Sequence, residues 1–308
     1  MFSFVMPAYK SQFIGKAIDS ILKQTFREFE LIIVNDASPE NLIAEIKQFN
    51  DNRIRYEENE KNIGGHDLVA NWNHCIEYAR NEYIILAADD DIFEPNFLED
   101  AVALIKKYPH VDIFRSGVKK INEQDNILDM EFPLKEYMTC REFTLYYAKG
   151  GTISCVSNYI IRKEALSKIG GFISFPKAHY SDDATALALI SNGIACMANN
   201  NFSFRVSSIN LSNRNDLTIA TEQLKATDLY MKWYLCHVEK IDTEPHDFFR
   251  KACYGYFKIR YIWMIDNLIS KLPISKIFFI IRYISSNKHL FKKEKCKLLF
   301  SYLINKRL

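Results

Sequence analysis

The chain has 308 residues, of which 48% are hydrophobic, so it can bury a full core and is not a disordered protein. Its 40 basic and 38 acidic side chains give a net charge of +2, and this balance argues against nucleic acid as a main partner. The seven cysteines are odd in number and include no CxxC pair, which indicates reduced thiols and no zinc site. These features predict a cytoplasmic globular protein with one large domain, or one domain plus an appendage.

The amino-terminal third alternates between short apolar runs and amphipathic segments. Strands are predicted over residues 2–6, 30–34, 53–57 and 83–88, and helices over 13–22, 42–49, 68–79 and 97–105. Ser38 and Pro39 offer an N-cap and a first-turn proline for the second helix. This alternation predicts an α/β fold with a mainly parallel sheet and helices on both faces.

No segment has the features of a leader or of a membrane span. The first residues are those of a strand rather than of a signal peptide. No run approaches the roughly 18 apolar residues that a spanning helix needs. The chain is therefore not expected to cross a membrane.

Three of the predicted strands end in distinctive residues. These are Pro7-Ala8-Tyr9, Asn35-Asp36 and Asp89-Asp90-Asp91. Ligands of open α/β sheets bind outside the carboxyl ends of the strands. We therefore expect the three strand ends to converge on one crevice.

The most informative of these ends has three consecutive carboxylates, Asp89, Asp90 and Asp91, after the apolar run 84–88. Adjacent carboxylates repel one another and raise each other's pKa values, and a divalent cation shared with an anionic ligand would remove this repulsion. Mg²⁺ or Mn²⁺ fits best, because these hard ions take one or two carboxylates and fill the other positions with water and phosphate oxygens. The alternative is a solvated acidic turn in which Asp91 caps the helix that begins near Pro95.

The rest of the chain divides into two parts. Residues 111–220 are less regular, with a short strand near 111–114 and two Gly-Gly pairs, and are read as the acceptor half of a domain that spans 1–220. From 221 to 308 the pattern becomes helical and rich in aromatic residues, which predicts a helical carboxyl-terminal extension. Its aromatic residues are read as packing rather than as a base-stacking platform.

With these pieces in place, the chain resembles the family 2 glycosyltransferases, whose catalytic domain has the GT-A fold. The matching segments occur in family order over roughly residues 2–215: FVMPAY at 4–9, SILKQTFREFELIIVNDAS at 20–38, NIGG at 62–65, YIILAADDDIFEP at 83–95, IGGF at 169–172 and SDDATALALISNG at 181–193. The resemblance implies a nucleotide-diphosphate sugar as substrate, with residues 1–110 as the half that binds it.

On the donor side, the resemblance gives Asp36 the role of accepting the imide N–H of a uracil or thymine ring, since a carboxylate is an acceptor only. The alternative for Asp36 is an Asx-turn that starts the next helix. Pro7, Ala8 and Tyr9 match the turn that lines the base pocket. Where relatives commonly have Arg-Asn, this chain has Ala70-Asn71, so Asn71, together with His66 and Asn73, is a candidate for a donor contact.

In the acidic run, the resemblance assigns Asp89 to the ribose hydroxyls and Asp90 to the metal ion, Mn²⁺ or Mg²⁺, that bridges the two phosphates. Asp91 is the metal ligand instead if the motif is Asp-x-Asp. Many relatives have a histidine after Tyr-Arg-Val, whereas here Ser207 follows Phe204-Arg205-Val206. Arg205 or Arg214 is the expected replacement for that phosphate or metal contact.

The pair Asp182-Asp183 matches the family's acidic pair at the start of a helix under the acceptor, where the second carboxylate is the general base. One of two adjacent carboxylates can have its pKa raised toward the working pH, which suits proton abstraction. The alternative is helix capping, for which aspartate is favoured.

The function that follows from the resemblance is an inverting, metal-dependent transfer of a sugar from a UDP-sugar to a hydroxyl of a glycan or lipid-linked glycan, in surface-polysaccharide synthesis. A non-catalytic nucleotide-sugar-binding protein is one alternative. A sugar nucleotidyltransferase is another, but it would carry a glycine-rich, arginine-containing loop after the first strand, which residues 7–16 lack.

The last segment, 268–308, has ten lysines and arginines against a single acid, Glu294, interleaved with apolar runs at 277–281 and 298–300. This composition predicts either a basic amphipathic element on the anionic inner face of the plasma membrane, or ordinary helices with a solvated basic face.

Overall fold

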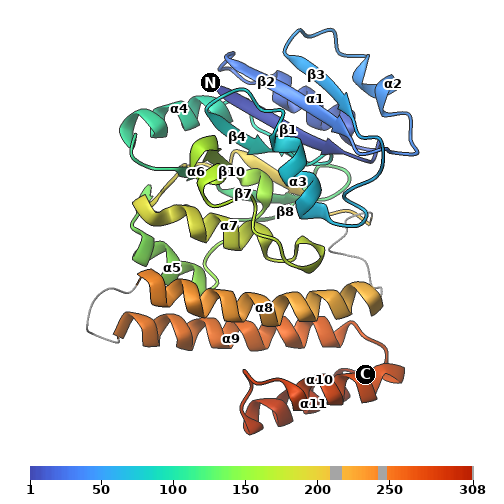
Figure 1. Cartoon of the computed structure of the whole chain (residues 1–308), viewed down its shortest axis with the longest axis vertical. Helices are drawn as coiled ribbons and strands as arrows, with labels where there is room; N and C mark the ends of the chain where they lie inside the picture. The colour runs from blue at the N-terminus through green and yellow to red at the C-terminus, as the bar shows by residue number, and fades with distance from the viewer. Residues whose placement is uncertain (209–216, 242–247, 307–308) are drawn as a thin grey trace. The chain divides into compact units, whose positions relative to one another are not determined.

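The computed structural model describes residues 1–208, 217–241 and 248–306 (Figure 1). Contacts within the chain divide it into two compact units. The sheet unit consists of Met1–Phe143, Thr152–Ser174 and Ser181–Ser207. The helical unit consists of Thr144–Gly151, Phe175–Tyr180 and Ser208–Leu308.

The sheet unit contains an eight-stranded sheet in the order β3-β2-β1-β4-β10-β6-β11-β9 and a four-stranded sheet in the order β5-β12-β7-β8. The strands are β1 (Phe2–Ala8), β2 (Phe29–Asn35), β3 (Ile54–Glu58), β4 (Tyr83–Leu86), β5 (Ile92–Phe93), β6 (Ile113–Arg115), β7 (Val118–Ile121), β8 (Ile127–Met130), β9 (Tyr137–Met138), β10 (Tyr159–Arg162), β11 (Ile194–Cys196) and β12 (Phe202–Arg205). The helices of this unit are α1 (Ile14–Leu22), α2 (Leu42–Ile46), α3 (Leu68–Ile76), α4 (Phe97–Lys107), α6 (Lys163–Lys168) and α7 (Ser181–Leu189), and α5 (Cys140–Ala148) runs from this unit into the other.

The first four strands of the large sheet are parallel, because each strand is followed by a crossover helix. The strand order reverses between β1 and β4, where ligands of such sheets bind. Beyond β4 the sheet is mixed, since β10 is antiparallel to both β4 and β6. The predicted α/β fold with a mainly parallel sheet is confirmed.

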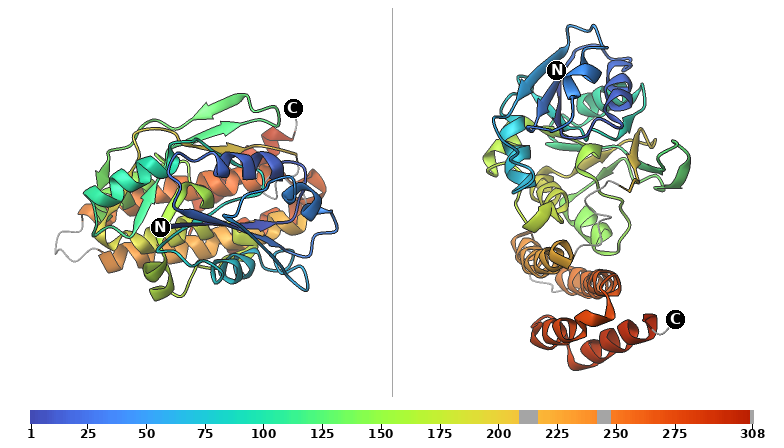
Figure 2. Two further views of the ribbon diagram at one scale, coloured as in Figure 1. Left: turned by 90° about the horizontal axis from the view of Figure 1, so that it is seen from above. Right: turned by 90° about the vertical axis from the view of Figure 1, so that its right-hand side faces the viewer.

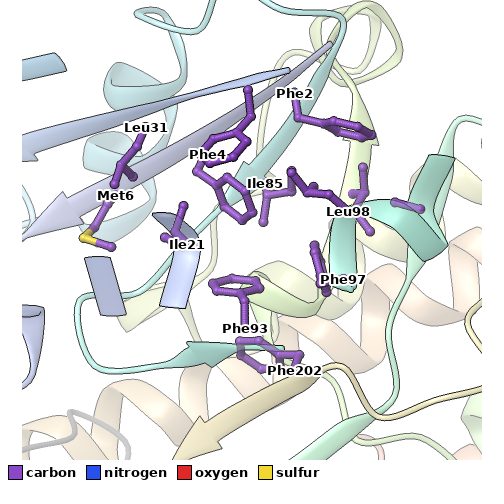
Figure 3. Close-up of a cluster of buried hydrophobic side chains, with 14 of the residues drawn as sticks. Phe2, Phe4, Met6, Ile21, Leu31, Ile85, Phe93, Phe97, Leu98 and Phe202 are labelled. Carbon is purple, nitrogen blue, oxygen red and sulfur yellow. The ribbon is translucent and has the colours of Figure 1, made fainter. Parts of the chain in front are cut away.

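The apolar core of the sheet unit lies between one face of the large sheet and the small sheet. Alternate side chains of β1, Phe2, Phe4 and Met6, face this core because side chains of a strand alternate between its faces (Figure 3). Phe93 of β5 joins the sheets, with ring centroids 5.1 Å from Phe4 and 5.3 Å from Phe202. Helices α1, α2 and α4 pack into this core, whereas α3 contacts β1 and β4 without entering it, so helices cover both faces.

The helical unit is built on two long helices, α8 (Leu217–Ile241) and α9 (Phe248–Ser270), which lie side by side in Figures 1 and 2. They are followed by α10 (Ile277–Ser286) and α11 (Lys292–Asn305). Tyr147 of α5 packs among the rings of Tyr234 and Phe257, and its hydroxyl accepts a hydrogen bond from Tyr230 (2.8 Å). The predicted helical extension is therefore present, and its aromatic side chains form a core.

Within the described residues, no helix combines the length and the apolar character needed to cross a bilayer.

Candidate active site

The ends of β1, β2 and β4 meet, as expected from the sequence. The backbone N–H of Asp36 donates to the carbonyl of Ala8 (3.0 Å). One carboxylate oxygen of Asp89, Oδ2, accepts from the backbone N–H groups of Tyr9 and Lys10, both at 2.9 Å. Asp89 therefore bridges the point between β1 and β4 where the strand order reverses, and burial raises its pKa.

Asp36 is the centre of a buried polar cluster. Its Oδ1 accepts from the side chain of Asn59 and from the backbone of Ile63, and its Oδ2 accepts from the backbone of Gly64, each at 2.8 Å. Asn71 lies beside it, because the same Asn59 amide donates to Asn71 Oδ1 (3.2 Å). The Asx-turn alternative for Asp36 is not what the structure shows, since Asn35 makes that bond, accepting from Ser38 N (2.9 Å).

Gly64 fits closely at the edge of the polar cluster around Asp36. A Cβ atom at this position would lie 2.9 Å from Asp36 Oδ2 and 3.2 Å from Asn71 Nδ2, which is too close. The NIGG loop is thus fitted around the Asp36 carboxylate. Asn59 was missed by sequence reasoning, although it directly follows β3 and the rule applied to the other strand ends would have found it.

The acidic run after β4 is buried to different depths. Asp90 is partly exposed, whereas Asp91 is only 2% exposed and its Oδ1 accepts from the backbone of Arg205 (3.0 Å). Burial, followed by the charge of Asp89, raises the pKa of Asp90 to about 6, and burial together with Asp90 raises the pKa of Asp91 well above its ordinary value. Asp91 does not cap α4, whose N-cap residue is Asn96.

The donor set at this strand end fits a hard divalent cation. The side chains of the run offer carboxylate oxygens, and a bound cation would relieve the repulsion between them, which adds to burial in raising their pKa values. No group of three or more His, Cys, Asp or Glu side chains in the described ranges is arranged to enclose a metal. Such a cation would therefore take one or two carboxylates here and fill its remaining positions with ligand oxygens and water, as Mg²⁺ and Mn²⁺ do.

The second acidic group is Asp182-Asp183 in the first turn of α7. The N–H of Asp183 donates to Asp182 Oδ1 (2.9 Å), and burial, followed by the charge of Asp183, raises the pKa of Asp182 to about 8. Asp183 is 7% exposed, and its Oδ1 is buried without a hydrogen-bond partner among the described residues. A buried carboxylate oxygen without a donor is costly to a fold, and it is suited to accept a proton from a ligand hydroxyl.

The segment before β10 connects the two acidic groups. Ser157 Oγ accepts from the backbone of Ala88 (3.2 Å), and the Ser157 hydroxyl also bonds Asp91. Burial raises the pKa of the neighbouring Cys155 thiol, and the charges of Asp91 and Asp182 raise it further. The acidic run and the start of α7 therefore both lie near Cys155. Nothing in the sequence pattern marked Cys155 or Ser157, because the segment lies between regular elements.

The structure also gives the surroundings of the other residues named from the sequence. Asn73 binds the backbone of Phe172, donating to its carbonyl (3.2 Å) and accepting from its N–H (2.7 Å), and thereby ties α3 to the IGGF segment. Tyr9 is 40% exposed at the end of β1. His66 is exposed in the loop before α3. Arg214 lies outside the described residues.

Comparisons with known proteins identify one family of related sequences. The model of the family described as "Glycosyl transferase family 2" matches residues 3–170. The putative glycosyltransferase EpsE of Bacillus subtilis is 31% identical over 125 residues, which are 39% of this chain and 44% of that protein. The UDP-Glc:alpha-D-GlcNAc-diphosphoundecaprenol beta-1,3-glucosyltransferase WfgD of Escherichia coli is 32% identical over 106 residues, 34% of this chain and 41% of its own length. The chain thus spans less than half the length of these two relatives.

Similar folds occur among solved structures. Residues 1–349 of TarS from S. aureus superpose with a TM-score of 0.69 at 18% identity, covering 99% of this chain and 90% of that one. The mannosyltransferase PcManGT from Pyrobaculum calidifontis, solved with GDP-Man and Mn2+, superposes with a TM-score of 0.55 at 12% identity, covering 99% of this chain and 86% of that one. At these identities the likeness supports the fold alone, which is the GT-A fold. Because the family model matches more than half of the chain, this protein belongs to glycosyl transferase family 2.

Proposed function

We propose that this protein transfers a sugar from a nucleoside-diphosphate sugar to a hydroxyl group of a glycan or lipid-linked glycan, with inversion at the anomeric carbon. The observation that carries the proposal is the presence of two acidic groups near Cys155. One lies at the strand ends beside the polar cluster of Asp36, and the other has a buried carboxylate oxygen without a hydrogen-bond partner among the described residues. The names of the relatives point the same way, since WfgD uses UDP-Glc and TarS was solved with UDP-GlcNAc.

On the donor side, Asp36 lies at the base of the nucleotide pocket, where a uracil N–H is the complementary donor for its remaining lone pair. Asn71, Pro7, Ala8 and Tyr9 surround this pocket at the strand ends. Asp89 holds the ribose side, and Asp90, the more accessible of the next two carboxylates, holds Mn²⁺ or Mg²⁺ with Asp91 behind it. When bound, the cation neutralises the charge on the departing diphosphate.

On the acceptor side, Asp183 is the general base and Asp182 supports it. Asp183 Oδ1 takes the proton of the acceptor hydroxyl as the hydroxyl oxygen forms a bond to the anomeric carbon. The bond between that carbon and the diphosphate oxygen breaks, and its electron pair leaves with the nucleoside diphosphate. Attack opposite the leaving group inverts the anomeric configuration.

The test separates binding from turnover. Calorimetry should show that UDP binds in the presence of Mn²⁺, with GDP as the comparison because PcManGT was solved with GDP-Man. Asp90→Asn should abolish the Mn²⁺-dependent part of this affinity. Asp183→Asn should leave it nearly unchanged while lowering turnover by roughly 10²-fold or more, as expected for loss of a general base.

Turnover is measured as UDP released from UDP-glucose or UDP-GlcNAc with a diphosphoundecaprenol-linked sugar as acceptor. Binding without turnover under any of these conditions would favour the non-catalytic alternative. Full activity of Asp183→Asn would remove Asp183 as the base, and Asp182 would be tested in its place.

We further propose that the segment 268–308 holds the protein on the anionic, cytoplasmic face of the membrane, where a lipid-linked acceptor of polysaccharide synthesis is found. Its helices bury one stripe, including Ile280, Ile284 and Leu298, within the helical unit. Phe278 and Phe300 remain 83% and 66% exposed among lysines, which is the composition of an interfacial helix.

A further inference from the structure

Arg205, at the end of β12, is completely buried against the acidic run. Its backbone N–H donates to Asp91 Oδ1 (3.0 Å), and its Nε donates to the carbonyl of Asp90 (2.8 Å). Arg205 thus binds both the side chain of Asp91 and the backbone of Asp90. The two segments are 115 residues apart in the chain.

The other edge of the guanidinium holds the turn of the β7–β8 hairpin. Nη1 donates to the carbonyl of Asn122 (2.9 Å) and to the carboxylate of Asp125, while the guanidinium carbon lies 4.4 Å from the centroid of the Phe13 ring. Lys16 of α1 forms an ion pair with the second oxygen of Asp125. The hairpin, α1 and the acidic run are therefore joined through two charged residues.

The turn that carries Asp125 is held by its own hydrogen bonds. Asn122 Oδ1 accepts from the backbone N–H groups of Gln124 (3.0 Å) and Asn126 (2.9 Å). Asp125 has φ of +66°, a conformation that aspartate tolerates better than most residues. The Asp125 carboxylate is thus presented to Arg205 from a closed turn rather than from a loose loop.

These contacts argue against the phosphate role considered for Arg205 from the sequence. A phosphate-binding arginine offers its planar fork to the ligand, whereas the Arg205 side chain is fully buried and its Nε and Nη1 donate to protein oxygens. The Arg205 side chain therefore binds the backbone of the acidic run and of the hairpin turn rather than a ligand.

We propose that Arg205 and Asp125 are positioning residues that fix the backbone at Asp90 and the side chain of Asp91, so that the acidic run presents its carboxylate oxygens to the cation in a set geometry. The inference rests on the proposed function, since it assumes a cation and a diphosphate at this strand end. Positioning of this kind matters because a misplacement of about 1 Å at a site can cost about 10²-fold in rate.

Two variants and one control test the proposal. Arg205→Lys keeps the positive charge but loses the fork that reaches Asp90 and Asn122 together. Asp125→Asn keeps the shape of the turn residue and loses its charge. Arg162→Lys is the matched control, because Arg162 likewise binds a carboxylate, that of Asp112, and a backbone carbonyl, that of Pro109. Arg162 is paired with Tyr83, at the opposite end of β4 from the acidic run.

The first measurement needs no ligand. Amide hydrogen exchange of residues 88–93, which lie away from the Arg162 contacts with Glu82 and Tyr83, should become faster in Arg205→Lys and Asp125→Asn, and should stay unchanged in the Arg162→Lys control. Unchanged exchange in the Arg205 variant would overturn the proposal whatever the protein's activity.

The second measurement is the calorimetric affinity for UDP with and without Mn²⁺. Arg205→Lys should weaken binding of UDP in the presence of Mn²⁺ by about tenfold or more, and should leave Mn²⁺-independent UDP binding unchanged. An equal loss with and without Mn²⁺, or an equal loss in the control, would mean a general structural role and would overturn the proposal. Failure of the wild-type protein to bind any nucleotide would instead overturn the proposed function, leaving hydrogen exchange to decide whether Arg205 holds the strand end.

Discussion

At the scale of single residues, the candidate site is a set of carboxylates whose roles are separated by their surroundings. Asp36 is surrounded by three protein donors, Asp89 by two backbone amides, and Asp183 has one buried oxygen without any described donor. These surroundings support the proposed roles, which are ligand binding for Asp36 and Asp89 and proton transfer for Asp183. A charged group that is left under-compensated lowers stability, and Asp182 offers a way to measure this cost.

Asp182→Asn is expected to stabilise the protein, and more so at high pH than at low pH. Burial raises the pKa of Asp182 from 3.8 to about 8 in the folded state, so between these values the folded protein holds a proton that the unfolded chain has lost. Stability contributed by this carboxyl group therefore falls as pH rises from about 4 to about 8, by at most about 1.4 kcal/mol per pH unit. The asparagine side chain does not ionise, so the variant does not lose stability in this way as pH rises.

Urea unfolding at pH 5 and pH 8.5, without divalent cations, measures the difference. The stabilisation by Asp182→Asn should be larger at pH 8.5 by roughly 1 to 3 kcal/mol. Asp19→Asn is the control, since Asp19 is a half-exposed aspartate paired with Lys23. The same gain at both pH values would show that Asp182 is ionised throughout this range and carries no such penalty.

The sequence alone was sufficient to predict site residues that directly follow a buried strand. Asp36 and Asp89 could be named because a polar residue after a buried parallel strand lies at the ligand edge of the sheet. Ser157 and Arg205 could not be placed in this way, because their partners are 69 and 115 residues away in the chain. Ser157 is brought near by the mixed half of the large sheet, and Arg205 by the small sheet. Arg205 was even assigned a ligand contact, since nothing in one sequence distinguishes an arginine that binds phosphate from one that binds backbone.

At the scale of elements, the periodic segments were predictable and the short ones were not. The first four strands and their helices fall within a few residues of the expected ranges, because each has a clear apolar period. The start of α2 differs: Asn41 is the N-cap and accepts from Ala44 N (3.3 Å), while Ser38 donates to the carbonyl of Tyr9. The β7–β8 hairpin escaped prediction, since its strands have four residues each and β8 is exposed along its length.

The helical unit contains one polar contact that we expect to stabilise several of its elements together. Asp228 Oδ1 accepts from the hydroxyls of Tyr261 (2.5 Å) and Tyr283 (2.8 Å) and from the amide of Asn287 (3.0 Å), which joins α8, α9 and the end of α10. Asp228→Ala leaves three largely buried donors without this acceptor. We expect it to lower the free energy of unfolding by about 2 kcal/mol or more.

Asp228→Asn should cost less, because its amide oxygen can still accept, and Glu222→Ala on the same helix should cost little, since Glu222 forms only an i,i+3 surface pair with Lys225. Thermal unfolding with hydrogen exchange over residues 217–287 distinguishes these variants. If the alanine and asparagine variants were equally stable, Asp228 would not have this role.

At the scale of the whole molecule, a net charge of +2 conceals a strong asymmetry. The segment 268–308 holds ten of the 40 basic side chains and only one of the 38 acidic ones. Its surface also presents large apolar side chains, with Phe278 and Phe291 exposed by 83% and 72%. The sequence allowed two interpretations of this segment, a membrane-bound amphipathic element or ordinary helices with a solvated basic face. Both predict helices, so only a measurement with lipid can distinguish them.

Sedimentation with vesicles tests the membrane proposal. The full chain should sediment with anionic phosphatidylserine vesicles at low salt, less at high salt, and not with neutral vesicles. Phe278→Ser, and separately Lys293→Glu with Lys297→Glu, should each reduce this binding, because they remove apolar insertion and charge attraction respectively. Phe248→Ser is the control, since Phe248 is 81% exposed but lies outside the segment. Unaltered sedimentation of all these variants would exclude the segment as the membrane contact.

The helical unit is assembled from three separate stretches of chain, and this limits how the protein can be recombined. Two of these stretches, 144–151 and 175–180, lie inside the sequence of the sheet unit. The core of the helices includes Tyr147 from the first stretch and Phe175 from the second, whose ring centroid is 5.7 Å from that of Tyr230. A chimera that replaced only the residues after Ser208 with those of a relative would place the relative's helices against Tyr147 and Phe175 of this chain. A working exchange of the helical unit between relatives would have to transplant the two internal stretches together with the helices, so that natural crossovers in this region are expected to be rare.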